Sequence, residues 1–227
     1  IMPGSSKEFI KRCVELADRV GINVEFPRKE YYNEMKIHLD FHNDVVRKLK
    51  FMSLQVRKAQ KKGACKSGMD TQFIVGAANE TDREILRMTE YLYKELKLRR
   101  VYFSAFEPVV NTPLENKKPE SKLREFRLYQ ASFLLRDYEM REKDLVFLKN
   151  GMLPLHIDPK TAIALRKELR VVVNNADFRE LLQVPGIGPK TARMIMQSRP
   201  FHSFLQLKKI VPVSYTHLRA HETSLHL

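Results

Sequence analysis

Two glycines two residues apart, placed between two short apolar-patterned segments, constrain the fold more than any other feature of this chain. The pattern predicts a helix over Phe178–Gln183, a tight turn over residues 184–188 and a second helix that begins at Pro189. A proline suits the first helical position because the N–H that it lacks has no partner there. The glycines Gly186 and Gly188 favour a tight turn because glycine readily adopts positive φ angles.

Such a turn also predicts an anion site. Backbone N–H groups of the glycines and of the following turn point outward beside a helix N-terminus, and that arrangement attracts phosphate. Lys190 and Arg193 add positive charge, and Ile187 is expected to fill the space between the two helices. The residues predicted to form this site are Gly186, Ile187, Gly188, Lys190, Thr191 and Arg193.

The segment VPGIGPKTA (184–192) resembles the hairpin of the helix-hairpin-helix family of DNA-backbone binders, and RPFHSFLQLKKI resembles the third helix that often follows. The resemblance implies that these six residues bind DNA, with contacts to phosphate rather than to bases and with binding that weakens as salt rises. An alternative is a hairpin that serves protein contacts or internal packing only.

The charge distribution agrees with a polyanionic partner. The chain of 227 residues has a net charge of +14. Residues 151–212 carry ten Lys and Arg against four Asp and Glu, whereas the much longer segment 1–110 carries 21 against 15. Positive charge is therefore densest in the part of the chain that contains the hairpin.

The first part of the chain predicts an α/β fold. Short apolar runs at residues 22–26, 71–76 and 101–106 read as strands, and helical patterns separate them. This βαβ order favours a parallel sheet covered by helices. Two S/T-x-x-E capping boxes, Ser5 with Glu8 and Thr81 with Glu84, are expected to begin helices.

Four regions follow from these patterns. We expect part of a barrel at residues 1–110, a helical connection at 111–150 with helices near 121–138 and 142–149, and a helix-hairpin-helix module at 151–212. Residues 213–227 are expected to be a non-native tail, because they resemble the translation of a sequencing-adapter sequence. His217 and His221 in that tail are therefore given no metal role.

Several residues in the first part resemble radical S-adenosylmethionine enzymes. Residues 72–76 (QFIVG), followed by Glu80-Thr81-Asp82, are similar to a strand and a downstream Glu-Thr of that family, and Asn23 and Glu25 resemble its polar strand-end positions. Residues 1–212 as a whole resemble the C-terminal part of family members assigned to DNA modification and repair.

The resemblance implies the C-terminal part of a partial (βα)6 barrel, containing strands three to six. It also implies S-adenosylmethionine and a 4Fe–4S cluster at the carboxyl ends of the strands, an external reductant, and radical chemistry on nucleic acid. The cofactor-binding residues that it implies are Asn23, Glu25, Gly76 and Ser104, and no catalytic residue is identified.

The sequence departs from this family at the cluster. The three cysteines of a CxxxCxxC motif are absent, and Cys13 and Cys65 cannot replace them, because three thiolates are the minimum for such a cluster. We therefore expect a fragment that begins inside the third strand, binds no cofactor by itself and is inactive alone, whereas the full-length protein is an enzyme.

Two other functions stay open. The chain is a non-catalytic DNA-binding adaptor if the complete gene also lacks the cysteine triad. It is an ordinary barrel enzyme, such as an aldolase-like lyase, if a lysine or metal ligands stand at strand ends.

The remaining features exclude other classes of protein. Two isolated cysteines exclude a disulfide scaffold and a thiolate zinc site, and no apolar run is long enough for a membrane span. His38 and His42 lack a third ligand, so no metal site is predicted. A cytoplasmic protein is expected.

Overall fold

The computed structural model describes residues 1–211 and 225–226, and these form two compact units. The first unit comprises residues 1–132 and 147–153, and the second comprises residues 133–146 and 154–227. The segment 111–150, expected to be a helical connection, is thus divided between the two. Apart from residues 225–226, the predicted non-native tail with His217 and His221 lies outside the described residues.

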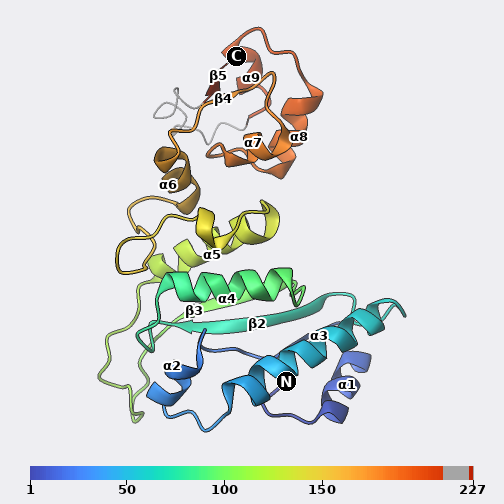
Figure 1. The fold of residues 1–227 in the computed structure, drawn as a ribbon, viewed down its shortest axis with the longest axis vertical. Coiled ribbons are helices and arrows are strands. Elements are labelled where there is room, and N and C mark those ends of the chain that lie inside the picture. The colour runs from blue at the N-terminus through green and yellow to red at the C-terminus, as the bar shows by residue number, and fades with distance from the viewer. Residues whose placement is uncertain (212–224, 227) are drawn as a thin grey trace. The chain divides into compact units, whose positions relative to one another are not determined.

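The first unit is a mixed α/β structure (Figure 1). Its three strands pair in parallel in the order β1-β2-β3. Its elements are α1 (Lys7–Leu16), β1 (Arg19–Gly21), α2 (Lys29–Glu34), the π-helix Phe41–Val46, α3 (Arg47–Gln60), β2 (Gly68–Val75), α4 (Asp82–Lys94), β3 (Arg100–Ala105) and most of α5 (Lys122–Asp137).

The parallel sheet predicted from the βαβ pattern is confirmed, but it has only three strands among the described residues, and these show no barrel. The strand predicted at residues 22–26 was wrong: β1 comprises Arg19–Gly21, just before that range, and within residues 22–26 Glu25 alone forms a bridge to Phe73. Glu25 has a φ of 59°, which breaks the extended conformation that a strand requires.

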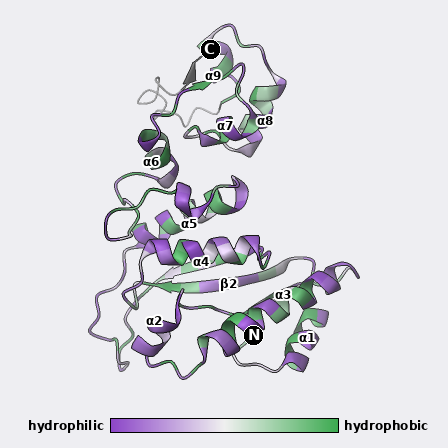
Figure 2. Cartoon of the chain, viewed as in Figure 1, coloured by the Kyte–Doolittle hydropathy of each residue, from purple (hydrophilic) through white to green (hydrophobic). Residues whose placement is uncertain are grey.

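The sheet has one fully buried face and one half-buried face. Along β2, Met69, Thr71, Phe73 and Val75 are buried, and the residues between them are only partly covered. Because successive side chains of a strand point to opposite faces, these four buried residues share one face of the sheet. Hydrophobic and hydrophilic residues are interspersed along α3, consistent with a helix that buries one side (Figure 2).

Local signals set the helix starts. Thr81 and Glu84 form the predicted capping box of α4, each side chain accepting from the backbone N–H of the other. The capping box predicted for Ser5 and Glu8 was wrong by one residue. α1 is capped by Ser6, whose hydroxyl accepts from the Phe9 N–H at 3.1 Å. The Ser5 hydroxyl instead donates to the carbonyl of Met2.

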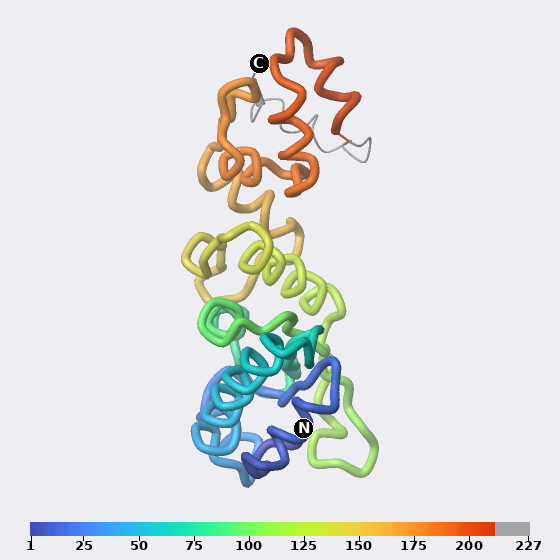
Figure 3. The backbone as a smooth tube through the Cα atoms, turned by 90° about the vertical axis from the view of Figure 1, so that its right-hand side faces the viewer, coloured from blue at the N-terminus to red at the C-terminus, as the bar shows by residue number. Residues whose placement is uncertain are grey.

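The second unit is mainly helical. Its elements after the end of α5 are a 3-10 turn (Glu142–Asp144), α6 (Pro159–Arg166), β4 (Val171–Val172), α7 (Phe178–Gln183), α8 (Pro189–Gln197), α9 (Phe204–Lys208) and β5 (Leu225–His226), which pairs in parallel with β4. The helix expected at 142–149 is only that 3-10 turn. The path through α7, the hairpin and α8 can be followed in Figure 3.

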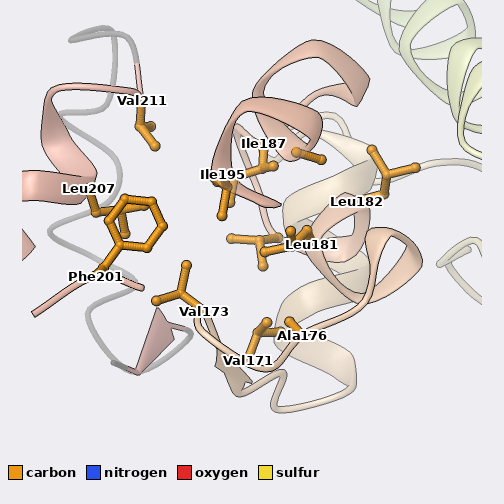
Figure 4. Packing of buried hydrophobic residues seen from close by; sticks show 12 residues of the cluster. Val171, Val173, Ala176, Leu181, Leu182, Ile187, Ile195, Phe201, Leu207 and Val211 are labelled. Atoms are coloured by element: carbon orange, nitrogen blue, oxygen red, sulfur yellow. The ribbon is translucent and has the colours of Figure 1, made fainter. Parts of the chain in front are cut away.

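One apolar cluster holds the second unit together. It joins side chains from β4, α7, α8, α9 and the loops between them, and Figure 4 shows them converging. Its members are Val171, Val173, Ala176, Leu181, Leu182, Val184, Ile187, Ala192, Ile195, Phe201, Leu207 and Val211. This core fixes the hairpin between α7 and α8.

Candidate nucleic-acid interface

The first helix of the hairpin begins at a complete capping box. The Asp177 carboxylate accepts from the Glu180 N–H at 2.7 Å, and the Glu180 carboxylate accepts from the Asp177 N–H at 2.8 Å. A cap of this kind stabilises a helix by about 1 kcal/mol. α7 has the predicted bounds, Phe178–Gln183.

The turn after α7 needs only one of its glycines for backbone conformation. Gly186 has a φ of +83°, a region that side chains disfavour. Gly188 has a φ of −92°, which any residue adopts. The prediction of positive φ is therefore confirmed for Gly186 and wrong for Gly188. At position 188 the lack of a side chain matters instead for the capping of α8.

Ile187 lies between these glycines with its side chain completely buried beside Leu181 and Ile195 (Figure 4). Its N–H donates to the Val184 carbonyl at 3.1 Å and closes the turn. Ile187, predicted to bind DNA, is therefore limited to backbone contacts with a ligand.

The N-terminus of α8 is open. Gly188 is its N-cap, the Gly188 carbonyl accepts from Ala192 N–H at 2.8 Å, and no side chain in the described part of the chain caps the first turn. Peptide N–H groups left unpaired at a helix N-terminus carry partial positive charge and attract anions. The exposed surface of Gly186 and the half-buried Gly188 border this turn.

The predicted basic residues flank the open turn. Lys190 and Arg193 are exposed, three residues apart on α8, and form no ion pair with a described residue. The Arg193 guanidinium lies over the Phe178 ring at 5.5 Å, which restrains it, and Thr191 is half-buried. Residues 181–211 contain five Lys and Arg and no acidic residue, so this segment is strongly basic.

The first turn of α6, in the same unit, is capped by the carboxylate of Asp158. α6 begins Asp158-Pro159-Lys160-Thr161-Ala162, and α8 begins Gly188-Pro189-Lys190-Thr191-Ala192. Both start with an extended N-cap residue followed by proline. In α6 the Asp158 carboxylate accepts from the Lys160 and Thr161 N–H groups at 3.1 and 3.0 Å.

The equivalent N–H groups of α8 face a position that has no carboxylate, because residue 188 is glycine. A carboxylate within the chain thus occupies at α6 the place that an external anion would take at α8. Sequence reasoning missed this repeated pentapeptide, and it missed Lys160, a residue that contacts the hairpin directly. The repeat relates the two helix starts but does not encode the burial of Lys160.

The residues predicted to bind a cofactor lie in the first unit, and the structure brings two of them together. Asn23 is exposed and hydrogen-bonds to the Glu25 side chain. Burial raises the pKa of the Glu25 carboxyl, and its Oε2 atom is buried without a hydrogen-bond partner among the described residues. Ser104 pairs in register with Ile74 on the neighbouring strand and is half-buried.

Gly76 follows β2, and the Glu120 side chain packs where a side chain of residue 76 would begin. A Cβ atom there would approach the Glu120 side chain to 2.5–2.7 Å, and the Gly76 N–H donates to the Glu80 carboxylate at 2.5 Å. Glu80 and Asp82, the residues of the Glu-Thr-Asp resemblance, are buried and bind Arg124. In this conformation Gly76 serves the packing of the loop before α5.

The described residues contain neither a metal-binding cluster nor a helix that could span a membrane. Within residues 1–211 and 225–226, no three His, Cys, Asp or Glu side chains gather as they would around a metal ion. None of the helices in this range is long and apolar enough to cross a membrane.

Comparison with known proteins supports the hairpin. The family model of the helix-hairpin-helix motif matches residues 166–219, which include α7, α8 and α9. No curated protein and no solved structure matches the chain. The motif indicates nucleic-acid binding, and the match begins at Arg166, the last residue of α6.

Proposed function

We propose that the second unit binds DNA through the phosphate backbone, with one phosphate at the N-terminus of α8. The observation that carries this function is the contrast at positions 158 and 188, where one helix holds its own carboxylate and the other leaves the same N–H groups open. The helix-hairpin-helix match and the strongly basic composition of residues 181–211 support it.

The proposed contacts divide by their chemistry. Backbone N–H groups at Gly188 and in the first turn of α8 donate to a phosphate oxygen, as helix N-termini do elsewhere. Lys190 and Arg193 contribute charge that steers the duplex and releases counterions. Neither group reads a base edge, so we expect affinity without sequence preference.

Gly188→Asp is the sharpest test, because it copies the N-cap of α6 into α8. The φ of −92° accepts a side chain, and a Cβ atom at position 188 makes only an ordinary 3.5 Å contact with the Tyr138 hydroxyl. The new carboxylate should cap α8 and raise its stability while it occupies the phosphate position. We expect DNA affinity to fall at least about tenfold without loss of thermal stability.

The measurement is fluorescence anisotropy of a labelled duplex at several salt concentrations, with thermal melting of each variant. Gly188→Asn is the matched control, since it also caps the helix but adds no charge, and it should weaken binding less. Unchanged affinity in Gly188→Asp would refute the proposed site. A chain that captures a protein but no duplex would favour the alternative of a hairpin for protein contacts.

We also propose that the first unit, within a longer protein that supplies the cluster cysteines, forms part of an S-adenosylmethionine site at the carboxyl ends of its strands. It is supported by the parallel order β1-β2-β3 and by the unpartnered, buried Oε2 of Glu25 beside Asn23, which suits a hydroxyl or amino donor. The described residues do not supply three thiolates for a 4Fe–4S cluster, so the radical modification of DNA and the reductant that it needs remain proposals for a longer protein.

Equilibrium dialysis with labelled S-adenosylmethionine tests this second function. We expect no binding by this chain alone, and binding by a longer protein that contains the cluster. Glu25→Gln in the longer protein removes the charge but keeps the shape of the side chain, and it should abolish this binding. Glu15→Gln, an exposed change on α1, is the control. Absence of binding by the unaltered longer protein would remove the function from this unit.

A further inference from the structure

Two residues outside the matched helix-hairpin-helix segment lie directly against the hairpin. Lys160 is in the first turn of α6, and Tyr138 follows α5. Both belong to the second unit, and neither is among the residues that the motif or the sequence patterns identify.

Lys160 is a buried cation that contacts the turn. Its side chain is 9% exposed, and its ammonium group donates to the Ile187 carbonyl at 2.5 Å. The same ammonium group lies 4.6 Å from the centre of the Tyr138 ring, a distance typical of a cation–π contact. It carries two further N–H donors, since an ammonium has three.

The hydroxyl group of Tyr138 lies close to Gly188, at the uncapped N-terminus of α8. It lies 3.5 Å from the position that a Cβ atom of residue 188 would take, and it forms no hydrogen bond with a described residue. Burial raises the pKa of the Tyr138 hydroxyl, so the group stays protonated and able to donate at neutral pH.

The Asp158 carboxylate of α6 indicates where an anion sits relative to such an N-cap. It projects from the side-chain position of the N-cap residue onto the N–H groups two and three residues later. At α8 that position is the vacant side of Gly188, which is also the side that the Tyr138 hydroxyl faces. A phosphate oxygen held by the α8 N–H groups therefore comes within reach of this hydroxyl.

We propose that Tyr138 and Lys160 complete the phosphate site of the hairpin, Tyr138 by donating a hydrogen bond to the bound phosphate and Lys160 by placing a buried positive charge behind Ile187. The inference rests on the proposed DNA-binding function and adds two residues to it. Tyr138 is a binding residue, whereas Lys160 is a positioning residue that acts through the turn and through its charge.

The charge of Lys160 makes binding depend on pH. Burial lowers the pKa of Lys160 to about 7, and the nearby Asp158 carboxylate partly opposes that effect. The described groups that face its ammonium are this carboxylate, the Tyr138 ring and the Ile187 carbonyl. Protonated Lys160 predominates below pH 7 and favours a phosphate, so DNA affinity should fall as pH rises through 7.

The first test removes the hydroxyl alone. Tyr138→Phe keeps the ring under Lys160, and we expect it to weaken binding of a labelled duplex about tenfold, as loss of a hydrogen bond to a charged group does. Tyr91→Phe is the matched control, because Tyr91 is also half-buried with a lysine over its ring, at 6.0 Å, but lies on α4 in the first unit. It should bind as the unaltered chain does.

The second test follows affinity from about pH 6 to about pH 8, the range in which a pKa near 7 changes charge. The unaltered chain should lose about three- to tenfold in affinity, and Lys160→Met should lose much less, because the charge at position 160 then no longer changes with pH. Asp158→Asn keeps a good N-cap but removes the carboxylate that favours protonated Lys160, so the midpoint of the fall should move to lower pH. This variant keeps the test valid if Lys160→Met does not fold.

The outcomes separate this inference from the function on which it rests. If the unaltered chain binds no duplex, both are overturned. If it binds and Gly188→Asp abolishes binding, but Tyr138→Phe and the pH profiles match the unaltered chain, the phosphate site stands and the roles of Tyr138 and Lys160 are refuted. Weaker binding by Tyr138→Phe at unchanged melting temperature, with a shifted pH midpoint in Asp158→Asn, supports the inference.

Discussion

The ammonium group of Lys160 donates a 2.5 Å hydrogen bond to the carbonyl of Ile187, the residue between the two glycines of the hairpin. This contact ties the first turn of α6 to the turn between α7 and α8. A buried lysine is costly unless its charge is used or compensated, because desolvation penalises the charged form. In the proposed phosphate site, the positive charge of Lys160 lies behind the uncapped N-terminus of α8 and favours the bound anion.

The two hairpin glycines should respond differently to alanine. Gly186→Ala forces a side chain into a φ of +83° and should destabilise the second unit by about 1–2 kcal/mol. Gly188→Ala meets no such strain, since its φ is −92° and its new contact is 3.5 Å from Tyr138. It should leave stability nearly unchanged while weakening DNA binding, as measured by chemical denaturation and anisotropy. Equal destabilisation by both changes would contradict the assigned conformations.

Lys190 and Arg193 should each contribute to the salt dependence of DNA binding. Lys190→Gln and Arg193→Gln should each reduce the slope of log affinity against log salt by about 1, because each removes one phosphate contact. Lys149→Gln, an exposed lysine in the first unit, is the control and should leave the slope unchanged. Slopes that stay the same in both hairpin variants would argue against contact with the duplex.

A buried ion-pair network supports the loop after β2. Arg124 contacts the Asp82 carboxylate at 2.7 Å and the Glu120 carboxylate at 2.5 Å, and Asp82 also accepts from the Leu153 N–H at 2.8 Å. Arg124→Met should destabilise the first unit by about 3–5 kcal/mol, because it leaves buried carboxylates unpaired. Chemical denaturation measures this loss.

The control for this network is Lys122→Met, two residues earlier on α5, which removes only the ion pairs of an exposed ammonium group. Its denaturation midpoint should match that of the unaltered chain. If Arg124→Met were equally harmless, the burial of the network would have no energetic consequence.

Glu25 should make the first unit less stable as pH rises. Burial raises the pKa of its carboxyl in the folded state, so the folded chain binds the proton more tightly than the unfolded chain. Stability from this group is full below the ordinary carboxyl pKa and is lost as pH rises through the raised value. Glu25→Gln should melt at a temperature that varies less across this range, measured by circular dichroism. The same pH dependence in both proteins would exclude Glu25 as its source.

The sequence by itself determined the hairpin. Pro189 and the Gly-x-Gly spacing act within a few residues, so turn and helix-start preferences were sufficient to place the end of α7 and the start of α8. The order of strands and helices in the first unit was also predictable, because apolar periodicity is a local property. The family match to residues 166–219 agrees with the part of the chain where these local signals are strongest.

Only the tertiary structure decided which residues surround the hairpin and how far the strands extend. β1 ends at Gly21 because pairing with β2, some 49 residues later in the chain, and the positive φ of Glu25 set its limits. The burial of Lys160 and the approach of Tyr138 to Gly188 likewise arise from contacts 27 or more residues apart, which no local pattern encodes. Lys160 and Lys190 stand in nearly identical pentapeptides, yet one is buried and the other exposed, because long-range packing rather than local sequence sets the surroundings of each.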